Sequence, residues 1–242
     1  MNITSIIENS GITYACPSCE HGRLSYQWGE IKYKESSSSL INHAKSDGWQ
    51  LEEYEGIFSI PLKCNMCEHP VFCTGKSYYV ITDVVYDDLG CPDLKYEMEI
   101  RPQFFTPPLE YIKIPKLCPE LVKNTLIESF YIAPISCSSA ANRIRVSIEI
   151  LLDSFNIPKA KNLHSRIELA KKSNSVFAPL EKAMIAIKWI GNEGSHSSIP
   201  LEDNHIKSAY RIVSHLLDEL YEPESSLKAL VSNINTNKGI IK

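Results

Sequence analysis

The first half of the chain alternates apolar and polar residues with a period of two, which is the pattern of half-buried β-strands. Val80–Tyr86 and Tyr96–Ile100 are predicted strands, and Asp87–Gly90 has the composition of the turn between them. Val71–Ile81 is rich in β-forming residues and is predicted as a strand and a turn. A serine run followed by spaced apolar residues predicts a short helix within residues 36–48.

From Cys118 onward the apolar period changes to about 3.6 residues, the spacing of amphipathic helices. Pro119-Glu120 is typical of a helix start, because proline fits the first turn and an acid favours the N-terminal end of the helix dipole. Five apolar stripes predict helices packed antiparallel around one core. The stripes are Leu121–Phe130, Ala140–Phe155, Leu163–Ala170, Phe177–Ile190 and Ile206–Leu220. The tail is polar, although residues 227–231 could form a last short helix.

The composition is that of an ordinary globular protein, with 43% hydrophobic and 22% charged residues. No apolar run approaches the roughly 18–20 residues that a transmembrane helix needs. The N-terminus lacks the basic start and long apolar stretch of a secretory signal. We therefore expect a cytoplasmic protein with no membrane partner.

Charge is uneven along the chain. Residues 1–116 contain 10 Lys and Arg against 16 Asp and Glu, a net charge of −6. Residues 117–242 contain 15 against 13, a net charge of +2. If nucleic acid binds anywhere, bulk charge makes the second half the better candidate.

Eight cysteines are many for a chain in a reducing compartment, where disulfides are disfavoured. Four of them form two Cys-x-x-Cys pairs, Cys16 with Cys19 and Cys64 with Cys67. Such a turn lets two thiolates converge on one ion, and two turns supply the four ligands of a closed tetrahedral site. The sequence therefore predicts a zinc ribbon with a structural Zn²⁺ ion, whose binding would contribute folding free energy.

The cysteine pairs could instead form disulfides or a redox centre. Paired disulfides would need an oxidising compartment, and a thioredoxin-like redox pair would need a βαβ pattern that neither motif has nearby. Catalytic zinc is disfavoured, because four cysteines leave no position for water. Cys73 could be a spare ligand or a half-buried strand residue, and the isolated cysteines are expected to be small core residues.

Prolines crowd the segment between the two patterns, at positions 102, 107, 108 and 115. Proline lacks the backbone N–H that strand pairing needs, so we expect regular pairing to stop there. The predicted fold class is α+β. A zinc ribbon with a small β-rich region occupies residues 1–115, a helical domain residues 116–222, and a polar tail residues 223–242.

An unusual polar sequence interrupts the fourth apolar stripe at residues 187–196. If the helix continues through it, Asn192 and His196 lie four residues apart on one face. Gly191 and Gly194 would let a neighbouring helix approach closely, at a cost of about 1 kcal/mol each in helix propensity.

The second predicted helix offers a partner face in Arg145 and Glu149, which are also four residues apart. Together with Asn192 and His196 they could form a polar cluster inside the helical domain. Three interpretations are open: buried polar groups that satisfy one another near a helix end, a nuclease site, or a ligand-binding pocket. A lone histidine at such a place is more often structural than catalytic.

Residues 145–149 (Arg-Val-Ser-Ile-Glu) and 191–196 (Gly-Asn-Glu-Gly-Ser-His), behind a Cys-x-x-Cys ribbon, resemble the domain of unknown function 4145. The resemblance covers the chain from Cys16 to about Leu220. That family occurs behind zinc ribbons and fused to bacterial restriction and other defence proteins. It is grouped with the HEPN superfamily, whose helical domains are often dimeric ribonucleases. The resemblance implies an all-α HEPN-like helical bundle and a homodimer.

Ribonucleases of that superfamily have an arginine followed by four to six residues and then a histidine. His196 matches the histidine, but residues 189–191 are Trp, Ile and Gly, and Lys188 is one residue too far. RNA cleavage needs an acid or base at the 2′-oxygen and a cation at the phosphate. His196 could serve the first role, and Lys188, Arg145 or Arg143 the second.

The missing arginine favours a non-catalytic binding or assembly module, which would recognise a partner protein, RNA or DNA in a bacterial defence or stress system. The aromatic residues of the ribbon could stack on bases or belong to its core. These residues are Tyr26, Trp28, Tyr33 and Trp49. The alternative is a metal-independent HEPN-type ribonuclease centred on His196, with Asn192, Lys188 and Arg145 beside it.

Overall fold

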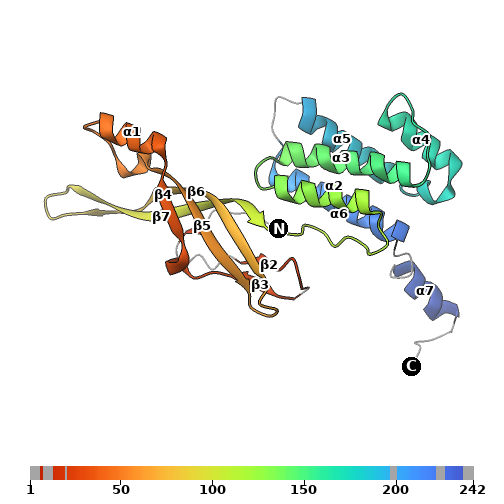
Figure 1. Cartoon of the computed structure of the whole chain (residues 1–242), viewed down its shortest axis with the longest axis horizontal. Helices are drawn as coiled ribbons and strands as arrows, with labels where there is room; N and C mark the ends of the chain where they lie inside the picture. The colour runs from red at the N-terminus through yellow and green to blue at the C-terminus, as the bar shows by residue number, and fades with distance from the viewer. Residues whose placement is uncertain (1–5, 8–12, 20, 197–200, 222–226, 237–242) are drawn as a thin grey trace. The chain divides into compact units, whose positions relative to one another are not determined.

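The computed structural model describes residues 6–7, 13–19, 21–196, 201–221 and 227–236. The chain divides into two compact units, which we call the sheet unit (Met1–Glu110) and the helical unit (Tyr111–Lys242). The order of elements, an antiparallel sheet followed by helices, confirms the predicted α+β class (Figure 1). None of the described helices is long and apolar enough to cross a membrane.

The sheet unit is built on one antiparallel sheet in the order β1-β7-β6-β5-β3-β2, with β4 also paired to β5. The strands are β1 (Ile6–Ile7), β2 (Tyr14–Ala15), β3 (Arg23–Ser25), β4 (Lys32–Glu35), β5 (Glu55–Cys64), β6 (Pro70–Tyr86) and β7 (Pro92–Thr106). Strands β3 and β4 pair with the same edge of β5, at Leu24↔Cys64 and Lys32↔Ser59. The sheet is therefore continuous with the cysteine motifs.

Two predictions about β6 and β7 were wrong in detail. Val71–Ile81 contains no turn, because β6 runs unbroken from Pro70 to Tyr86. Pro102 does not stop pairing; it lies inside β7 opposite Gly75, where the register shifts. A bulge leaves one residue unpaired and so accommodates the missing N–H of a proline.

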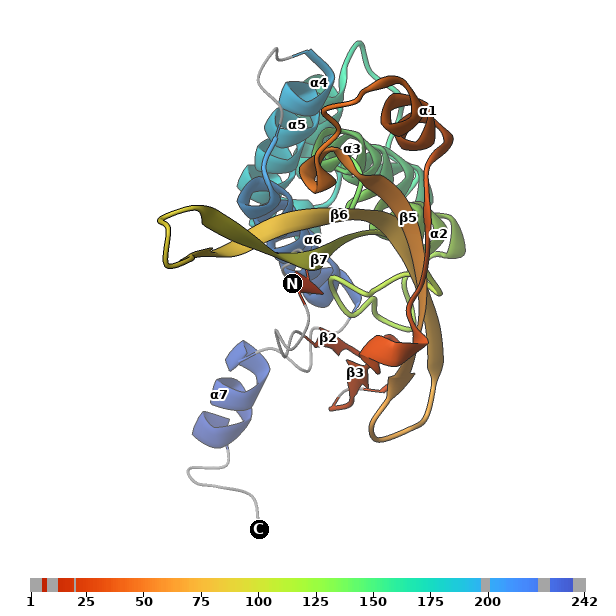
Figure 2. The same cartoon turned by 90° about the vertical axis from the view of Figure 1, so that its left-hand side faces the viewer.

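The predicted turn between the two strands is confirmed. The Asp87 carboxylate accepts hydrogen bonds from the backbone N–H groups of Leu89 (2.9 Å) and Cys91 (2.8 Å), and Gly90 has φ of 78°. Because β5 pairs with β6 only as far as Tyr78, the far ends of β6 and β7 continue as a two-stranded ribbon (Figure 2).

Residues alternate strictly between the two faces of β5, and its buried positions are Gly56, Phe58, Ile60, Leu62 and Cys64. The side chains of the last four pack with buried residues of β6 and β7 into the core of the sheet unit. The predicted short helix is α1 (Ser37–Lys45), flanked by the 3-10 turns η1 (Trp28–Glu30) and η2 (Leu51–Glu53). Ser36 caps α1 by accepting a hydrogen bond from the Ser39 N–H (3.2 Å).

All five predicted helices are present in the helical unit: α2 (Glu120–Ile132), α3 (Cys137–Ser154), α4 (Leu163–Ser173), α5 (Glu181–His196) and α6 (Asp203–Tyr221). The further helix α7 (Leu227–Thr236) forms in the tail. Phe177 belongs to the 3-10 turn η3 (Ser175–Phe177) and not to α5. The apolar stripes meet in one core, in which the Tyr210 hydroxyl lies 3.0 Å from the Ser129 hydroxyl.

Candidate metal centre and cationic cavity

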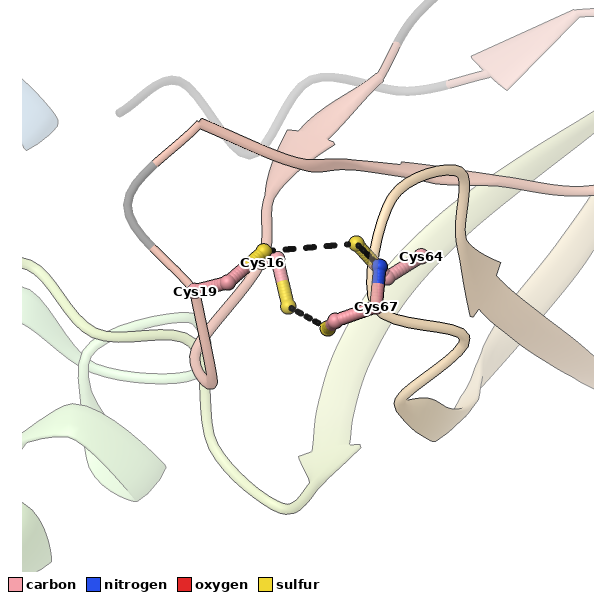
Figure 3. Close-up of side chains that lie close together, drawn as sticks. All are labelled: Cys16, Cys19, Cys64 and Cys67. Atoms are coloured by element: carbon pink, nitrogen blue, oxygen red, sulfur yellow. Dashed lines mark hydrogen bonds between the residues drawn. The ribbon is translucent and has the colours of Figure 1, made fainter.

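The four cysteines of the two Cys-x-x-Cys pairs lie together in the sheet unit (Figure 3). Their sulfur atoms all lie within 4.8 Å of one another. The Cys16 and Cys67 sulfurs are 3.7 Å apart, and those of Cys19 and Cys64 are 3.6 Å apart. The predicted convergence of the two distant motifs is therefore confirmed.

Strand pairing brings the motifs together. Cys16 follows β2, Cys64 ends β5, and β3 pairs with the last residues of β5. Each motif folds as a tight turn in which backbone N–H groups point at sulfur: Ser18 N–H donates to Cys16 Sγ at 3.3 Å, and Met66 N–H donates to Cys64 Sγ at 3.4 Å. Such donors favour thiolates, the form that binds metal.

Gly22 closes the centre on one side. A Cβ atom at this position would lie 2.2 Å from Cys64 Sγ and 2.7 Å from Cys19 Sγ. Only a residue without a side chain leaves the sulfur atoms in place. Gly22 is a site residue that the cysteine pattern did not indicate.

The thiols differ in their protonation. The backbone N–H of Cys67 lowers the pKa of the Cys64 thiol to about 6. The contact with the Cys67 thiol and the burial of Cys19 itself raise the pKa of Cys19 to about 12. Burial also raises the pKa of Cys16. Metal binds thiolates, so a metal ion at this centre would release the protons of the Cys16 and Cys19 thiols.

The sulfur spacing fits one metal ion and excludes disulfides. A disulfide requires an S–S distance of about 2.05 Å, and all eight cysteines are free. A tetrahedron of sulfurs around zinc at about 2.3 Å has edges of about 3.8 Å, close to the two distances observed. Cys73 lies outside the group of four among the described residues; it is buried in β6, where burial raises its pKa to about 12.

The aromatic residues singled out in the sequence divide into two groups. Tyr26, Trp28 and Trp49 pack against the core of the sheet unit. Tyr33 is 53% exposed. Three of the four are therefore half-buried against this core, and Tyr33 is the most exposed of them.

In the helical unit, the glycines of residues 187–196 have the predicted effect. A Cβ at Gly191 would lie 2.6 Å from Cβ of Arg145, and one at Gly194 would lie 2.5 Å from the backbone oxygen of Ser138. Arg145 and Ser138 belong to α3. Both glycines thus let α5 approach α3 closely, and α5 continues through residue 196.

A cavity of about 330 Å³ opens beside this contact. Its lining includes three of the predicted residues, Arg145, Lys188 and Asn192, and also Glu149. His196 lies in α5, but its side chain is outside the described residues. The structure therefore brings three of the four candidate residues around one cavity.

Three further cationic residues line the cavity and were missed in the sequence: Lys159, Lys161 and Arg166. Lys159 and Lys161 come from the connection between α3 and α4, which carries no apolar period, and Arg166 comes from the first turns of α4. The basic sequence after Pro158 is the signal that could have indicated them.

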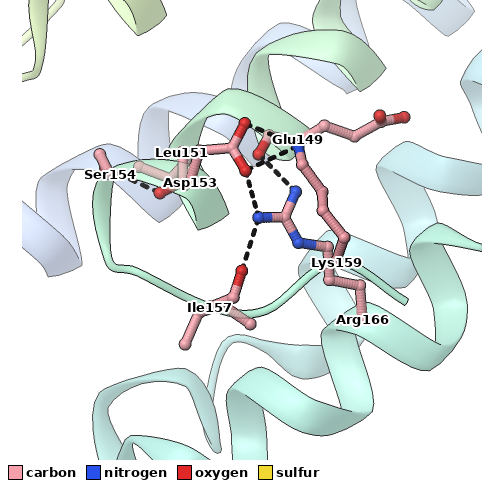
Figure 4. A network of polar contacts seen from close by, with 7 residues as sticks. All are labelled: Glu149, Leu151, Asp153, Ser154, Ile157, Lys159 and Arg166. Atoms are coloured by element: carbon pink, nitrogen blue, oxygen red, sulfur yellow. Dashed lines mark hydrogen bonds and ion pairs between the residues drawn. The ribbon is translucent and has the colours of Figure 1, made fainter.

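Arg166 is the best anchored of these residues, with 4% of its surface exposed. Its guanidinium donates to the backbone oxygens of Glu149 (2.9 Å) and Ile157 (2.7 Å) and pairs with Asp153 (Figure 4). Its Nε is buried without a hydrogen-bond partner. Lys159 also pairs with Asp153, and this contact, with that of Arg166, lowers the pKa of the carboxyl group.

The lining is positive, with five cationic side chains and the single carboxylate of Glu149, although Asp153 offsets part of this charge through Lys159 and Arg166. Arg145 pairs with Glu149 and also donates to the Asn142 side chain at 3.0 Å. Lys161 and Lys188 make no ion pair with any described residue. The arrangement can attract and hold an anion.

Two family models match the chain, one in each unit. Residues 128–237 match a domain of unknown function (DUF4145), and residues 4–105 match another domain of unknown function (DUF8608). The resemblance to DUF4145 is thus confirmed for the helices, but its predicted extent is wrong, because the cysteine region matches a different model. Neither the curated proteins nor the solved structures contain a match.

Proposed function

We propose that this chain is a non-catalytic binding module, in which structural zinc organises the sheet unit and the cavity of the helical unit binds a phosphate-bearing anion. In this proposal the cysteine region is a zinc ribbon. The helical unit is HEPN-like, as the resemblance to DUF4145 implies.

The donor set supports zinc as the metal. Four sulfur ligands in tetrahedral spacing are typical of zinc or iron–sulfur centres. Two Cys-x-x-Cys turns that face one another give a closed site for a single zinc ion. Because all four positions are taken by protein, the ion would stabilise the fold and would not activate water.

The positive charge of the cavity lining is the observation that supports a phosphate-bearing ligand. Guanidinium and ammonium groups donate charge-assisted hydrogen bonds to phosphate oxygens. Arg166 is already fixed by two backbone carbonyls, so it loses little side-chain entropy on binding. The first turn of α4, which begins at Leu163, adds the positive end of a helix dipole at the same cavity.

A non-catalytic role is supported by the residues at 189–191, none of which is the arginine of the ribonuclease motif. Arg145 is held by Glu149 and Asn142. The ribonuclease alternative keeps Lys188, Arg145 and Asn192 as phosphate contacts and assigns the acid–base step to His196. It predicts metal-independent RNA cleavage that His196→Ala abolishes while the helices stay folded.

Calorimetric titration with inorganic phosphate and with a nucleoside monophosphate tests the proposal. We expect saturable binding that Lys188→Gln weakens about tenfold or more, since a hydrogen bond to a charged group contributes about 1.5–3 kcal/mol. The matched control is Lys172→Gln, an exposed cation of α4 outside the cavity. Absence of saturable binding, or an equal loss in the control, would contradict the proposal.

Parallel assays separate the two candidate roles. RNA incubated with the purified protein should remain intact for a binding module, and cleavage that depends on His196 would favour the ribonuclease instead. Sedimentation of the protein tests the homodimer that the resemblance implies.

A further inference from the structure

The face of the sheet that points away from the core of the sheet unit has an unusual composition. Directly opposed residues on neighbouring strands share one face of a sheet, and we call the exposed set the outer face. Across β4, β5, β6 and β7 its rows include Lys34–Ile57–Lys76–Arg101 and Lys32–Ser59–Thr74–Phe104, followed by Pro61–Phe72–Thr106. On the other side of Ile57 the row Glu55–Tyr78–Glu99 carries two carboxylates.

Large apolar side chains lie exposed in the middle of this face. Ile57 is 61% exposed, Phe72 is 59% exposed and Phe104 is 50% exposed. They accompany a groove of about 450 Å³, which is lined by Ile57 and Phe104 together with Lys32 and Lys34. Exposed apolar side chains that adjoin one another are characteristic of interaction sites.

The charges around the groove are positive. Lys32, Lys34 and Lys76 make no ion pair with any described residue, and Arg101 pairs with Glu99 beside the Tyr78 ring. The region as a whole is acidic, with a net charge of −6 over residues 1–116. The lining of the groove nevertheless contains Lys32 and Lys34 and no carboxylate, so the charge is positive at the place where Phe104 is exposed.

We propose that the outer face binds single-stranded nucleic acid. Ammonium groups at the edge and centre of the face would contact the phosphates, and the rings of Phe72 and Phe104 would stack on unpaired bases. This combination of a basic groove with exposed aromatic side chains binds single strands with little sequence preference. An acidic peptide could form ion pairs with the lysines, but it would not supply bases to stack on the rings of Phe72 and Phe104.

The inference is independent of the proposed function of the helical unit, because every residue named lies in the sheet unit. It also reverses the expectation from bulk charge, which favoured the second half of the chain. The local arrangement of charge, and not the net charge of the region, determines where nucleic acid would bind.

Fluorescence anisotropy with a labelled single-stranded oligonucleotide tests the inference on the full chain. We expect Phe104→Ala and Phe72→Ala each to weaken binding about 5-fold or more, the effect of losing one stacked base. The double replacement of Lys32 and Lys34 by Gln should lower the slope of log affinity against log salt by about 0.7 per lysine.

Matched controls come from the same unit. Tyr86→Ala removes an exposed aromatic ring from the hairpin, and Lys45→Gln removes an exposed cation from α1. Both should bind the oligonucleotide like the unaltered protein. Circular dichroism and zinc content should be unchanged in all variants, because every replaced side chain is exposed.

Three results would overturn the inference. The first is no binding of the oligonucleotide, and the second is binding that the controls weaken as much as the phenylalanine variants. The third is equal affinity for an acidic peptide of the same length, which would assign the face to a protein partner. Adding Lys188→Gln to the phenylalanine variants should not change their loss of oligonucleotide affinity. A negative result for phosphate binding at the cavity can therefore be distinguished from a negative result for oligonucleotide binding at the sheet.

Discussion

The two units of this chain obtain an ordered core in different ways. In the helical unit, buried residues recur within single helices, and neighbouring helices such as α2 and α3 follow one another along the chain. In the sheet unit, β3 pairs with the end of β5, so Leu24 lies opposite Cys64. The cysteine cluster is located at this pairing.

This difference explains where a metal would matter. A pairing between distant segments must offset a larger loop-closure entropy than a contact between neighbouring helices. A metal ion that ligates Cys16, Cys19, Cys64 and Cys67 would link the two segments directly. The helical unit has no comparable requirement, since its apolar stripes supply the contacts locally.

The largest expected effect is therefore the loss of a cysteine ligand. We expect Cys16→Ser to destabilise the sheet unit by more than about 4 kcal/mol, the range in which loss of a metal site falls. The helical unit should keep its own thermal transition. Differential scanning calorimetry with hydrogen exchange checks both statements.

Cys91→Ser is the control for that experiment, because Cys91 is an exposed free cysteine in the hairpin turn. It should behave like the unaltered protein. If Cys16→Ser destabilised both units equally, the metal could not be said to stabilise the sheet unit alone.

A smaller effect is expected at the glycine beside the sulfurs. Gly22→Ala places a Cβ against Cys64 Sγ and Cys19 Sγ, so we expect zinc affinity to fall by about 10–100-fold, as for other residues that position metal ligands. Competition with a chelator measures the affinity. Gly29→Ala, which has nothing within 4 Å of its added Cβ, should leave it unchanged.

In the helical unit the corresponding test is Gly194→Ala. Its Cβ would meet the backbone of Ser138, and overpacking of this kind costs about 1–3 kcal/mol. The higher helix propensity of alanine stabilises the helix by about 1 kcal/mol relative to glycine. The net result should be a loss of about 1 kcal/mol, seen as a lower thermal midpoint of the helical unit alone. A raised midpoint would show that α3 and α5 are less close than described.

The smallest effect concerns pH. Lys159 and Arg166 lower the pKa of the Asp153 carboxyl group in the folded protein. The ionised carboxylate therefore stabilises the folded state fully above the unfolded-state pKa of about 3.9, and this stabilisation is lost as the pH falls through the lower pKa of the folded state. Asp153 is 44% exposed, so we expect less than about 1 kcal/mol. The stability difference between Asp153→Asn and the unaltered protein should be constant above about pH 5 and shrink in acid. A difference that persists at pH 2 would contradict this.

The sequence was most informative where one local pattern determines the structure. The spacing of Cys16, Cys19, Cys64 and Cys67 predicted their cluster because each turn fixes two sulfurs by itself. The apolar stripes predicted the helices for the same reason. Gly191 and Gly194 predicted a close helix approach, because only a missing Cβ permits it.

Other features that depend on distant pairing could not be predicted, because no ligand motif marks them in the sequence. Lys159, Lys161 and Arg166 join the cavity only because the connection after α3 folds back beside α5. Phe72 and Phe104 lie in β-forming stretches, and alternation alone does not say which face of a strand will be covered. Their exposure follows from the register of β5, β6 and β7.

X-ray absorption at the zinc edge, with metal analysis of protein purified under reducing conditions, tests the metal centre most directly. The account predicts one zinc ion per chain with four sulfur neighbours at about 2.3 Å. A sheet unit that is fully folded without metal, or an ion whose neighbours include nitrogen or oxygen, would contradict it.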